Sequence, residues 1–497
     1  MLQISGEGLT LKKFIEVVRN GEKVSLSDSA KKKIKKSRDV VDNLVKQNKV
    51  VYGLTTGFGP LCNVSIPQDK TEELQRNLIR SHASGVGNPY SEEIVRGAML
   101  LRANALAKGN SGVRVELVEK ILELLNEKIY PYVPEKGSVG ASGDLAPLSH
   151  LGLVIIGEGE CIVDGKRVSA KEVLQSKKIH SLSLSYKEGL AFNNGTPFIT
   201  SVAALTVYDS DVLVKNAQIS NAMILDVQRG CLAALDPRLY ELRRHPGAKE
   251  CAKVLLKLLE GSKLVHSNKN KVQDAYSLRA SATVLGASID AINYVKNVVE
   301  IEMNSATDNP LVFEEGAVSG ANLHGQPLAL AADFLSIALS EIADISERRI
   351  ETLVDSKNNE DLPGFLIEGS GLNSGFMIPQ YTAAALVSEN KVLSHPASVD
   401  SIPTSANQED HVSMGSIAAR KALMILKNVQ AVIAIELLCA AQALDFRKEK
   451  PANLVSKAHR FIRRQVSFAK EDRAFYKDIE ILQKIVESGE LADEIFN

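Results

Sequence analysis

The stretch Lys136-Gly-Ser-Val-Gly-Ala-Ser-Gly-Asp-Leu-Ala-Pro-Leu-Ser-His150 is the most informative part of the sequence. Its three glycines, the last of them Gly143, leave the backbone free to turn tightly. A segment rich in Gly, Ser and Ala that ends in Asp-Leu-Ala-Pro is usually a loop that leads into a helix, with Asp144 as the N-cap. For the central tripeptide Ala141-Ser142-Gly143 taken alone, this ordinary interpretation is preferred.

The same tripeptide also permits an unusual reaction. A tight bend would bring the amide nitrogen of Gly143 against the carbonyl carbon of Ala141. Ring closure, with dehydration of Ser142 and loss of two waters, would give a five-membered imidazolone with an exocyclic methylene. That methylene is a strong electrophile, and no unmodified side chain is one. The reaction needs a small first residue, a serine as the source of the methylene, and a glycine nitrogen that can approach closely.

The longer string from Gly137 to His150 resembles the signature of the ammonia-lyases that use a 4-methylidene-imidazol-5-one (MIO) group. This family comprises histidine, phenylalanine and tyrosine ammonia-lyases and related aminomutases. The resemblance implies an MIO formed from Ala141-Ser142-Gly143, with no external cofactor. It also implies a mainly α fold, as in the ammonia-lyase and fumarase-like superfamily, with a long-helix bundle and a smaller mixed N-terminal region that holds the MIO loop.

The composition is that of an ordinary globular protein: 497 residues, 44% of them hydrophobic and 24% charged. A net charge of −1 gives no reason to expect nucleic acid or an anionic membrane as a partner. The long uncharged stretches are not continuously apolar, so no membrane span is expected, and no signal peptide is evident. The five cysteines are scattered, which predicts reduced thiols in a cytoplasmic protein. The nine histidines form no HExxH-like set, so no metal is expected.

Hydrophobic periodicity predicts a mainly helical chain. The residues from 151 to 167 are the main exception, because Leu151–Ile156, Glu160–Val163 and Lys166–Val168 suit strands, with a turn at Asp164-Gly165. A soft boundary near residue 197 separates a mixed N-terminal domain, 1–197, from a helical bundle domain, 198–497. The predicted helices cover 29–47, 71–84, 91–129, 198–235, 248–260, 278–304, 327–355, 376–392 and 411–445.

Two residues of the N-terminal region are candidates for contact with the substrate. Tyr52 lies in the Gly-rich loop Val51–Pro60, where a tyrosine acts as a base only if its pKa falls well below ~10. Packing of the ring under the loop would also explain it, but similarity to the family's Tyr-Gly-x-x-Thr-Gly-Phe-Gly loop implies that Tyr52 takes the β-proton. The pair Ser81-His82 resembles the histidine enzymes, which implies that His82 contacts the substrate ring.

Two further motifs resemble family elements that hold the amino and carboxylate groups of the substrate. The Asn-Gly-Thr element gives Asn194 a contact with the MIO or with these groups. The motif Val272-Gln-Asp-Ala-Tyr-Ser-Leu-Arg279 implies that Arg279 binds the carboxylate through a bidentate, charge-assisted pair, with Gln273 and Tyr276 beside it. Asn304 and Asp308 are interpreted as scaffolding.

The last two motifs bear on which ring the enzyme accepts. Glu409, in a long match that runs from Ser394 to Met414, is the residue of the histidine enzymes, where the phenylalanine and tyrosine enzymes generally have glutamine. A carboxylate can accept a hydrogen bond from an imidazole N–H, but it is a costly neighbour for a phenyl ring. Leu323, in contrast, replaces a phenylalanine, and the residues from Ala280 to Thr283 also depart from the histidine-enzyme pattern.

Together these resemblances imply a carbon–nitrogen lyase that converts L-histidine to trans-urocanate and ammonia. Whether the electrophile captures the amine or the ring of the substrate stays open. A tyrosine or phenylalanine ammonia-lyase, or a 2,3-aminomutase, is the alternative, and a non-catalytic helical oligomer is a third possibility. The family also implies a homotetramer with active sites shared between chains, while exposed apolar stripes on long helices are themselves typical of oligomers.

Overall fold

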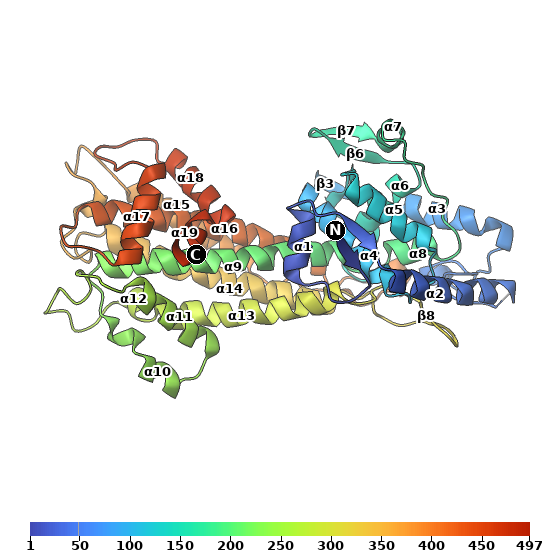
Figure 1. Ribbon diagram of the computed structural model, residues 1–497, viewed down its shortest axis with the longest axis horizontal. Coiled ribbons are helices and arrows are strands. Elements are labelled where there is room, and N and C mark those ends of the chain that lie inside the picture. The colour runs from blue at the N-terminus through green and yellow to red at the C-terminus, as the bar shows by residue number, and fades with distance from the viewer. Residues whose placement is uncertain (48) are drawn as a thin grey trace. The chain divides into compact units, whose positions relative to one another are not determined.

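The computed structural model describes residues 1–47 and 49–497, which form two compact units (Figure 1). The first unit holds residues 1–205, 296–332 and 396–420, and the second holds 206–295, 333–395 and 421–497. Four long helices contribute residues to both units: α9 (Pro197–Val227), α13 (Ser281–Met303), α14 (Gln326–Val354) and α16 (Gly415–Asp445). The prediction of a mainly α protein built on long helices is confirmed. The contiguous domains 1–197 and 198–497 stay a prediction, and neither compact unit is a single stretch of chain.

Short helices and small sheets make up most of the first unit. Its sheets are β1 with β2 (parallel), β3 with β5, the three strands β4-β6-β7, and β8 with β9. The strands are β1 (Leu2–Ile4), β2 (Val24–Leu26), β3 (Val86–Pro89), β4 (Tyr130–Pro131), β5 (Pro134–Lys136), β6 (Glu160–Val163), β7 (Lys166–Ser169), β8 (Leu311–Phe313) and β9 (Gly316–Val318). The helices are α1 (Leu11–Val18), α2 (Asp28–Lys46), α3 (Thr71–His82), α4 (Glu92–Ala107), α5 (Val115–Asn126), α6 (Leu145–Ile155), α7 (Ala170–Ser176) and α8 (Glu188–Asn193), with 3₁₀ turns at Gly59–Leu61, Gln68–Lys70 and Ser405–Asn407.

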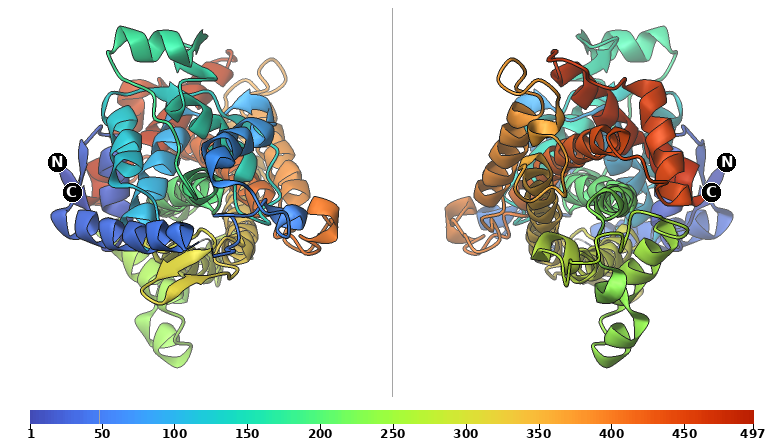
Figure 2. Two further views of the ribbon diagram at one scale, coloured as in Figure 1. Left: turned by 90° about the vertical axis from the view of Figure 1, so that its right-hand side faces the viewer. Right: turned by 90° about the vertical axis from the view of Figure 1, so that its left-hand side faces the viewer.

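The predicted hairpin at Asp164-Gly165 is present. Both turn residues have positive φ, 48° and 74°, and the turn joins β6 to β7 in an antiparallel pair. Asp and Gly tolerate that conformation, which is why the sequence marks the turn. The hairpin and α7 lie together and project from the rest of the first unit (Figure 2).

The predicted strand Leu151–Ile156 is wrong, because these residues belong to helix α6 and its C-cap. Most of α6 is buried, and its second half, Leu151–Ile155, is an unbroken apolar run instead of a stripe. Such a run cannot be told from a buried strand by periodicity alone. Pro147 in the first turn is compatible with the helix, since the amides there have no helical acceptor.

The continuous helix predicted over 91–129 is also wrong. The structure breaks it into α4 and α5, with a loop between them in which Gly109 and Gly112 have φ of 82° and 69°. A Cβ on Gly112 would lie 2.5 Å from a Cγ2 methyl of Val41, so this loop passes close to α2. The apolar residues on both sides of the loop keep helical spacing, and this hides the break.

The second unit is helical in all its regular elements among the described residues. Besides parts of the four long helices, it contains α10 (Pro237–Leu242), α11 (Pro246–Leu258), α12 (Tyr276–Arg279), α15 (Met377–Leu393), α17 (Asn453–Gln465), α18 (Tyr476–Ser488) and α19 (Glu490–Phe496), with 3₁₀ turns at Leu232–Leu235 and Gly364–Leu366.

Helices α9 and α16 are long and apolar enough to cross a membrane by length and composition. Most of the apolar stretch of each is buried inside the protein, which is what the core helix of a globular protein also shows. The structure describes all five cysteines, and each is a free thiol.

Three helices of the first unit pack against one another and position the candidate site. These are α3, α6 and α8. The buried side chain of Gln75 on α3 ties α3 to α8, because its Oε1 accepts hydrogen bonds from the backbone N–H groups of Gly189 (2.9 Å) and Leu190 (3.2 Å). The C-terminal end of α3, the N-terminal end of α6 and the C-terminal end of α8 all meet at one cavity.

Candidate active site

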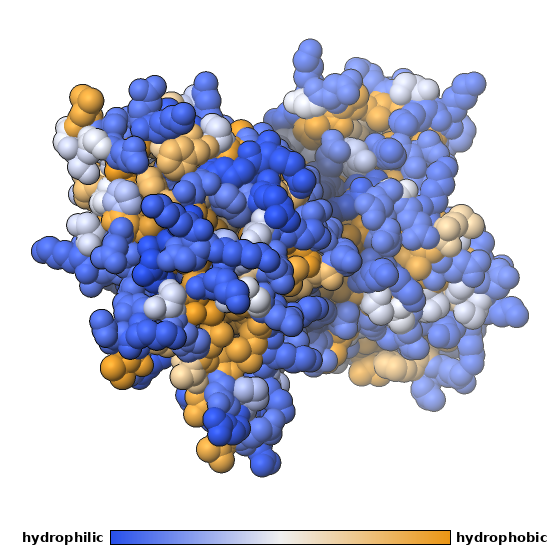
Figure 3. All heavy atoms as spheres, turned by 60° about the vertical axis from the view of Figure 1, so that its left-hand side comes forward, coloured by the Kyte–Doolittle hydropathy of each residue, from blue (hydrophilic) through white to orange (hydrophobic). Residues whose placement is uncertain are grey.

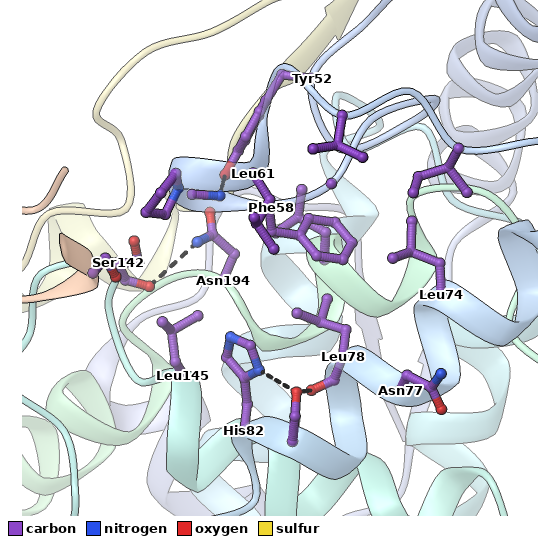
Figure 4. A pocket seen from close by; sticks show the side chains of 18 of the residues that line it. Tyr52, Phe58, Leu61, Leu74, Asn77, Leu78, His82, Ser142, Leu145 and Asn194 are labelled. Atoms are coloured by element: carbon purple, nitrogen blue, oxygen red, sulfur yellow. Dashed lines mark hydrogen bonds between the residues drawn. The ribbon is translucent and has the colours of Figure 1, made fainter.

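A cavity of about 480 Å³ lies entirely within the first unit (Figure 4). It brings together five of the residues that the sequence singled out, from five separate parts of the chain. These are Tyr52, His82, Ser142, Asn194 and Glu409. Most of the remaining lining is apolar, from the loop after Tyr52 and from α3.

The tripeptide Ala141-Ser142-Gly143 lies against the segment that follows α8. The carbonyl of Ser142 accepts from the backbone N–H of Gly195 (3.1 Å) and from Nδ2 of Asn194 (3.4 Å). Gly143 has φ of 71°, and a Cβ on it would lie only 2.0 Å from the carbonyl oxygen of Gly195. A glycine is therefore required at position 143 by both the conformation and the contact.

Asp144 does not have the capping role that the ordinary interpretation gave it. Its side chain makes no N-cap bond to α6. Instead its Oδ2 accepts from the backbone N–H groups of Phe198 and Ile199, both at 2.9 Å, in the first turn of α9. Burial raises the pKa of this carboxyl to about 7, although these hydrogen bonds favour the charged form. Asp144 thereby fixes the backbone after Gly143 to the start of a core helix.

The Tyr52 hydroxyl lies at the cavity and accepts a hydrogen bond from the backbone N–H of Gly59 (3.1 Å). Burial raises the pKa of Tyr52, and the Gly59 N–H opposes this only in part. A base needs the opposite shift, which a nearby cation would give. Among the described residues that line the cavity there is no Lys or Arg.

His82, at the end of α3, offers the cavity a hydrogen-bond acceptor. Its Nδ1 lies 3.0 Å from the Ser81 hydroxyl, which donates to the carbonyl of Leu78 (3.2 Å). When that hydroxyl gives its one proton to Leu78, Nδ1 is the donor of the first bond, and this tautomer leaves Nε2 as an acceptor for the cavity. Burial lowers the pKa of His82, so the ring stays neutral near pH 7.

Glu409 and Asn194 supply two more acceptors. The carboxylate of Glu409 accepts from the Ser142 hydroxyl and, through Oε2, from the Thr404 hydroxyl (3.1 Å). Oδ1 of the buried Asn194 has no hydrogen-bond partner among the described residues. An unpaired buried acceptor beside a cavity is costly unless a ligand satisfies it.

Ala141 and Gly143 flank Ser142 without lining the cavity themselves, and four further predicted site residues do not line it either. Gln273, Tyr276 and Arg279 belong to the second unit, where Arg279 donates to Oε1 of Gln273 and its guanidinium lies 4.8 Å from the centre of the Tyr276 ring. Leu323 belongs to the first unit, in a loop before α14, and is also not among the lining residues. The sequence assignments of these four stay predictions.

Several lining residues were not predicted from the sequence. Leu74 and Leu78 lie eight and four residues before His82, on the same face of α3. That spacing could have identified both once His82 was placed. Phe58 and Leu61 come from the loop after Tyr52, and no periodicity shows which loop side chains turn inward. Among the described residues, no group of three or more His, Cys, Asp or Glu side chains is placed to hold a metal.

The sequence profile of the aromatic amino acid lyases, described as "Aromatic amino acid lyase", matches residues 9–464. The chain belongs to the aromatic amino acid lyase family. A histidine ammonia-lyase of Alkaliphilus oremlandii is 55% identical over 99% of this chain and 98% of its own length. Among solved structures, a lyase of the same name from Trypanosoma cruzi is 41% identical, with a TM-score of 0.93 over 100% of this chain and 95% of that one. A tyrosine aminomutase from Streptomyces globisporus is 36% identical, with a TM-score of 0.96 over 100% and 98%. This aromatic amino acid lyase is thus similar to proteins named for two different reactions.

Proposed function

We propose that this protein is a histidine ammonia-lyase, which releases ammonia and trans-urocanate from L-histidine. The observation that carries the choice of substrate is the pair of acceptors in the cavity, Nε2 of His82 and the carboxylate of Glu409. An imidazole ring brings N–H donors to such a pair, and a phenyl ring brings none. The similarity to relatives named histidine ammonia-lyase agrees with this choice.

The residues present fit an MIO formed from Ala141-Ser142-Gly143. Gly143 has the conformation and the absent side chain that a close approach of its nitrogen needs. Its N–H has no hydrogen-bond acceptor among the described residues, so no bond has to break before it reacts. When formed, the MIO supplies an electrophile that makes the substrate's amine a better leaving group.

The protein's own side chains would bind the substrate and move the β-proton. Tyr52 takes that proton, and Oδ1 of Asn194 accepts from the substrate's ammonium group. His82 and Glu409 hold the ring. Arg279 binds the carboxylate, with Gln273 and Tyr276 beside it. A cation brought near Tyr52 would also offset the increase in its pKa that burial causes.

We infer a homotetramer in which Gln273, Tyr276, Arg279 and Leu323 reach the cavity of another chain. Tyr276, which has a proposed role in binding, is 72% exposed, and Val272, which precedes Gln273, is 92% exposed. Hydrophobic side chains also lie exposed elsewhere in the second unit, as at Leu372 and Val392. Figure 3 shows hydrophobic areas scattered among hydrophilic ones on the face that it draws. The proposed location is the cytoplasm, in keeping with five free cysteines.

Near-ultraviolet absorbance of reactions with L-histidine, L-tyrosine and L-phenylalanine tests the function directly, because each lyase product is a conjugated acrylate. We expect a signal with histidine and little with the other two. A signal with only tyrosine or phenylalanine would overturn the substrate assignment. Ser142→Ala should abolish the signal, and the mass of the unaltered protein should be two waters below the encoded value.

An aminomutase is the second candidate, and the similarity to the tyrosine aminomutase structure favours it. A 2,3-aminomutase would return the amine to the neighbouring carbon, so a β-amino acid would accumulate in place of the acrylate. Chromatography of the same tyrosine reaction separates the two outcomes. A chain with the encoded mass and no product from any substrate would favour the third possibility, a non-catalytic oligomer.

A further inference from the structure

The backbone at Gly195 is held from two sides. On one side its N–H donates to the carbonyl of Ser142 (3.1 Å), and its carbonyl accepts from the N–H of Asp144 (2.6 Å). On the other side, a Cβ on Gly195 would lie 2.4 Å from Nη2 of Arg102 and 2.5 Å from the carbonyl oxygen of Thr307. Gly195 therefore cannot move away from the tripeptide unless Arg102 and Thr307 move as well.

Arg102 is a fully buried cation in the middle of α4 that does not line the cavity. Its Nη1 donates to the carbonyl of Ala191 in α8 (2.9 Å), and its Nη2 donates to the Thr307 hydroxyl (3.3 Å). Its Nε has no partner among the described residues. Burial lowers the pKa of Arg102 to about 10, which still leaves the guanidinium charged near pH 7. Such a residue costs free energy to bury, so stability alone is a poor explanation for it.

The counter-charge to Arg102 also fixes the other end of α8. Asp308 is fully buried and accepts from the ammonium of Lys187 (2.8 Å) and from the Ser111 hydroxyl (2.8 Å). Lys187 directly precedes α8 and is also fully buried. The helix that delivers Asn194 and Gly195 is thus held by one buried cation at its start and another near its end.

We propose that Arg102 is a positioning residue for maturation of the tripeptide, because it holds Gly195 and thereby keeps Ser142 and Gly143 in the bent backbone that ring closure needs. This inference rests on the proposed function. In the reaction, the nitrogen of Gly143 bonds to the carbonyl carbon of Ala141. One water takes that carbonyl's oxygen with the amide protons of Ser142 and Gly143. The second takes the hydroxyl of Ser142 and its Cα proton, so no oxidant is needed.

The test is the intact mass of purified full-length protein at fixed times after synthesis, which reports maturation and not turnover. We expect Arg102→Met to mature about tenfold more slowly or worse, since misplacement by about 1 Å can cost that much in rate. Arg102→Lys keeps the charge and should restore part of the rate. Thr307→Val, a milder change that removes one acceptor of Arg102, should slow maturation less.

Arg96 provides the matched control, because it is a buried arginine on the same helix. Its guanidinium donates instead to the carbonyls of Val17 (2.6 Å) and Val18 (3.1 Å). Arg96→Met should lower the melting temperature as Arg102→Met does, but leave the mature fraction, the share of chains two waters lighter than encoded, unchanged.

The inference would be overturned if Arg102→Met and the unaltered protein had equal mature fractions. It would also be overturned if the Arg96 and Arg102 variants lost the same share of mature protein. If Arg102→Met does not fold, the comparison of Arg102→Lys and Thr307→Val with the control decides it. An unaltered protein at its encoded mass would refute the proposed function itself.

Discussion

Glu409 has one oxygen that would lose its partner when the tripeptide matures. Oε2 accepts from the Thr404 hydroxyl, and Oε1 accepts from the Ser142 hydroxyl, which ring closure would remove. Oε1 would then be free to accept from a ring N–H of the substrate. Glu409→Gln keeps the shape but removes the charge, so we expect kcat/KM for L-histidine to fall by about 30- to 160-fold, the value of a charge-assisted hydrogen bond of ~2–3 kcal/mol.

Any slow turnover of L-phenylalanine by the same variant should change far less, because a phenyl ring has no N–H to lose. Asp410→Asn removes the adjacent, exposed carboxylate and serves as the control. Equal losses of kcat/KM for both substrates would show that Glu409 does not recognise the substrate's ring. Initial rates from the absorbance of the two products measure both effects.

The raised pKa of Tyr52 predicts how the rate depends on pH. A base acts in its deprotonated form, and burial makes that form less populated at neutral pH. We therefore expect kcat/KM to rise as pH rises through the neutral and alkaline range. Tyr52→Phe should cost about 10²- to 10⁴-fold and should remove this rise from the residual rate. If kcat/KM of the Tyr52→Phe variant still rose with pH in the same way, the pH dependence would belong to another group.

At the residue scale, resemblance to family motifs was more informative about the site than secondary-structure propensity was. Tyr52, His82, Ser142, Asn194 and Glu409 are far apart in the sequence, yet they line one cavity. Family motifs identify such residues because each motif fixes a residue type at a place in the fold. Their individual roles stay predictions. Arg102 had no such signal, since an arginine within an apolar helix does not reveal from sequence which backbone it holds.

At the level of secondary-structure elements, sequence patterns located most helices but not every boundary. Serine is a residue type that favours N-caps, and the hydroxyl of Ser27 accepts from the N–H of Ala30 at the start of α2. Caps and turn residues act through neighbouring backbone, so they can be seen in the sequence. The identity of α6 and the break between α4 and α5 depend on what packs around them, and periodicity does not contain that information.

The link between α3 and α8 leads to a prediction about stability. Gln75 is fully buried, and its Oε1 is the acceptor for two backbone N–H groups of α8. Gln75→Leu would leave both donors unpaired, so we expect it to destabilise the protein by about 2 kcal/mol or more. Arg76→Leu, at the next, exposed position of α3, should have little effect. Thermal unfolding measures both, and similar midpoints for the two variants would contradict this role of Gln75.

At the scale of the whole molecule, the residues proposed to hold the substrate are split between the two units. The cavity with Ser142 and Tyr52 belongs to the first unit, and Arg279 belongs to the second. Sequence motifs give no information on this division, because a motif match does not say which copy of the chain supplies each residue. The proposal that active sites are shared between chains can therefore be tested by combining two variants, one from each unit.

Two inactive variants should restore each other when they are made together in one cell. If a site takes Ser142 from one chain and Arg279 from another, mixed tetramers of Ser142→Ala and Arg279→Met contain sites in which both residues are intact. Random assembly gives about a quarter of all sites this composition, so we expect up to that share of the unaltered activity. If one chain supplied both residues, every site would carry one defect and the mixture would stay inactive.

Ser142→Ala mixed with Tyr52→Phe is the matched control for this complementation. Both residues line the same cavity of one chain, so every site carries one defect whichever chains assemble. We expect activity from the first mixture and only residual activity from the second. Recovery of activity in the control would mean that Tyr52 and Ser142 of one site come from different chains. If neither mixture recovered activity, Arg279 and Ser142 of the same chain would act in one site. Because the two mixtures differ in a single partner variant, the difference between them depends on where Arg279 acts and not on how well the chains assemble.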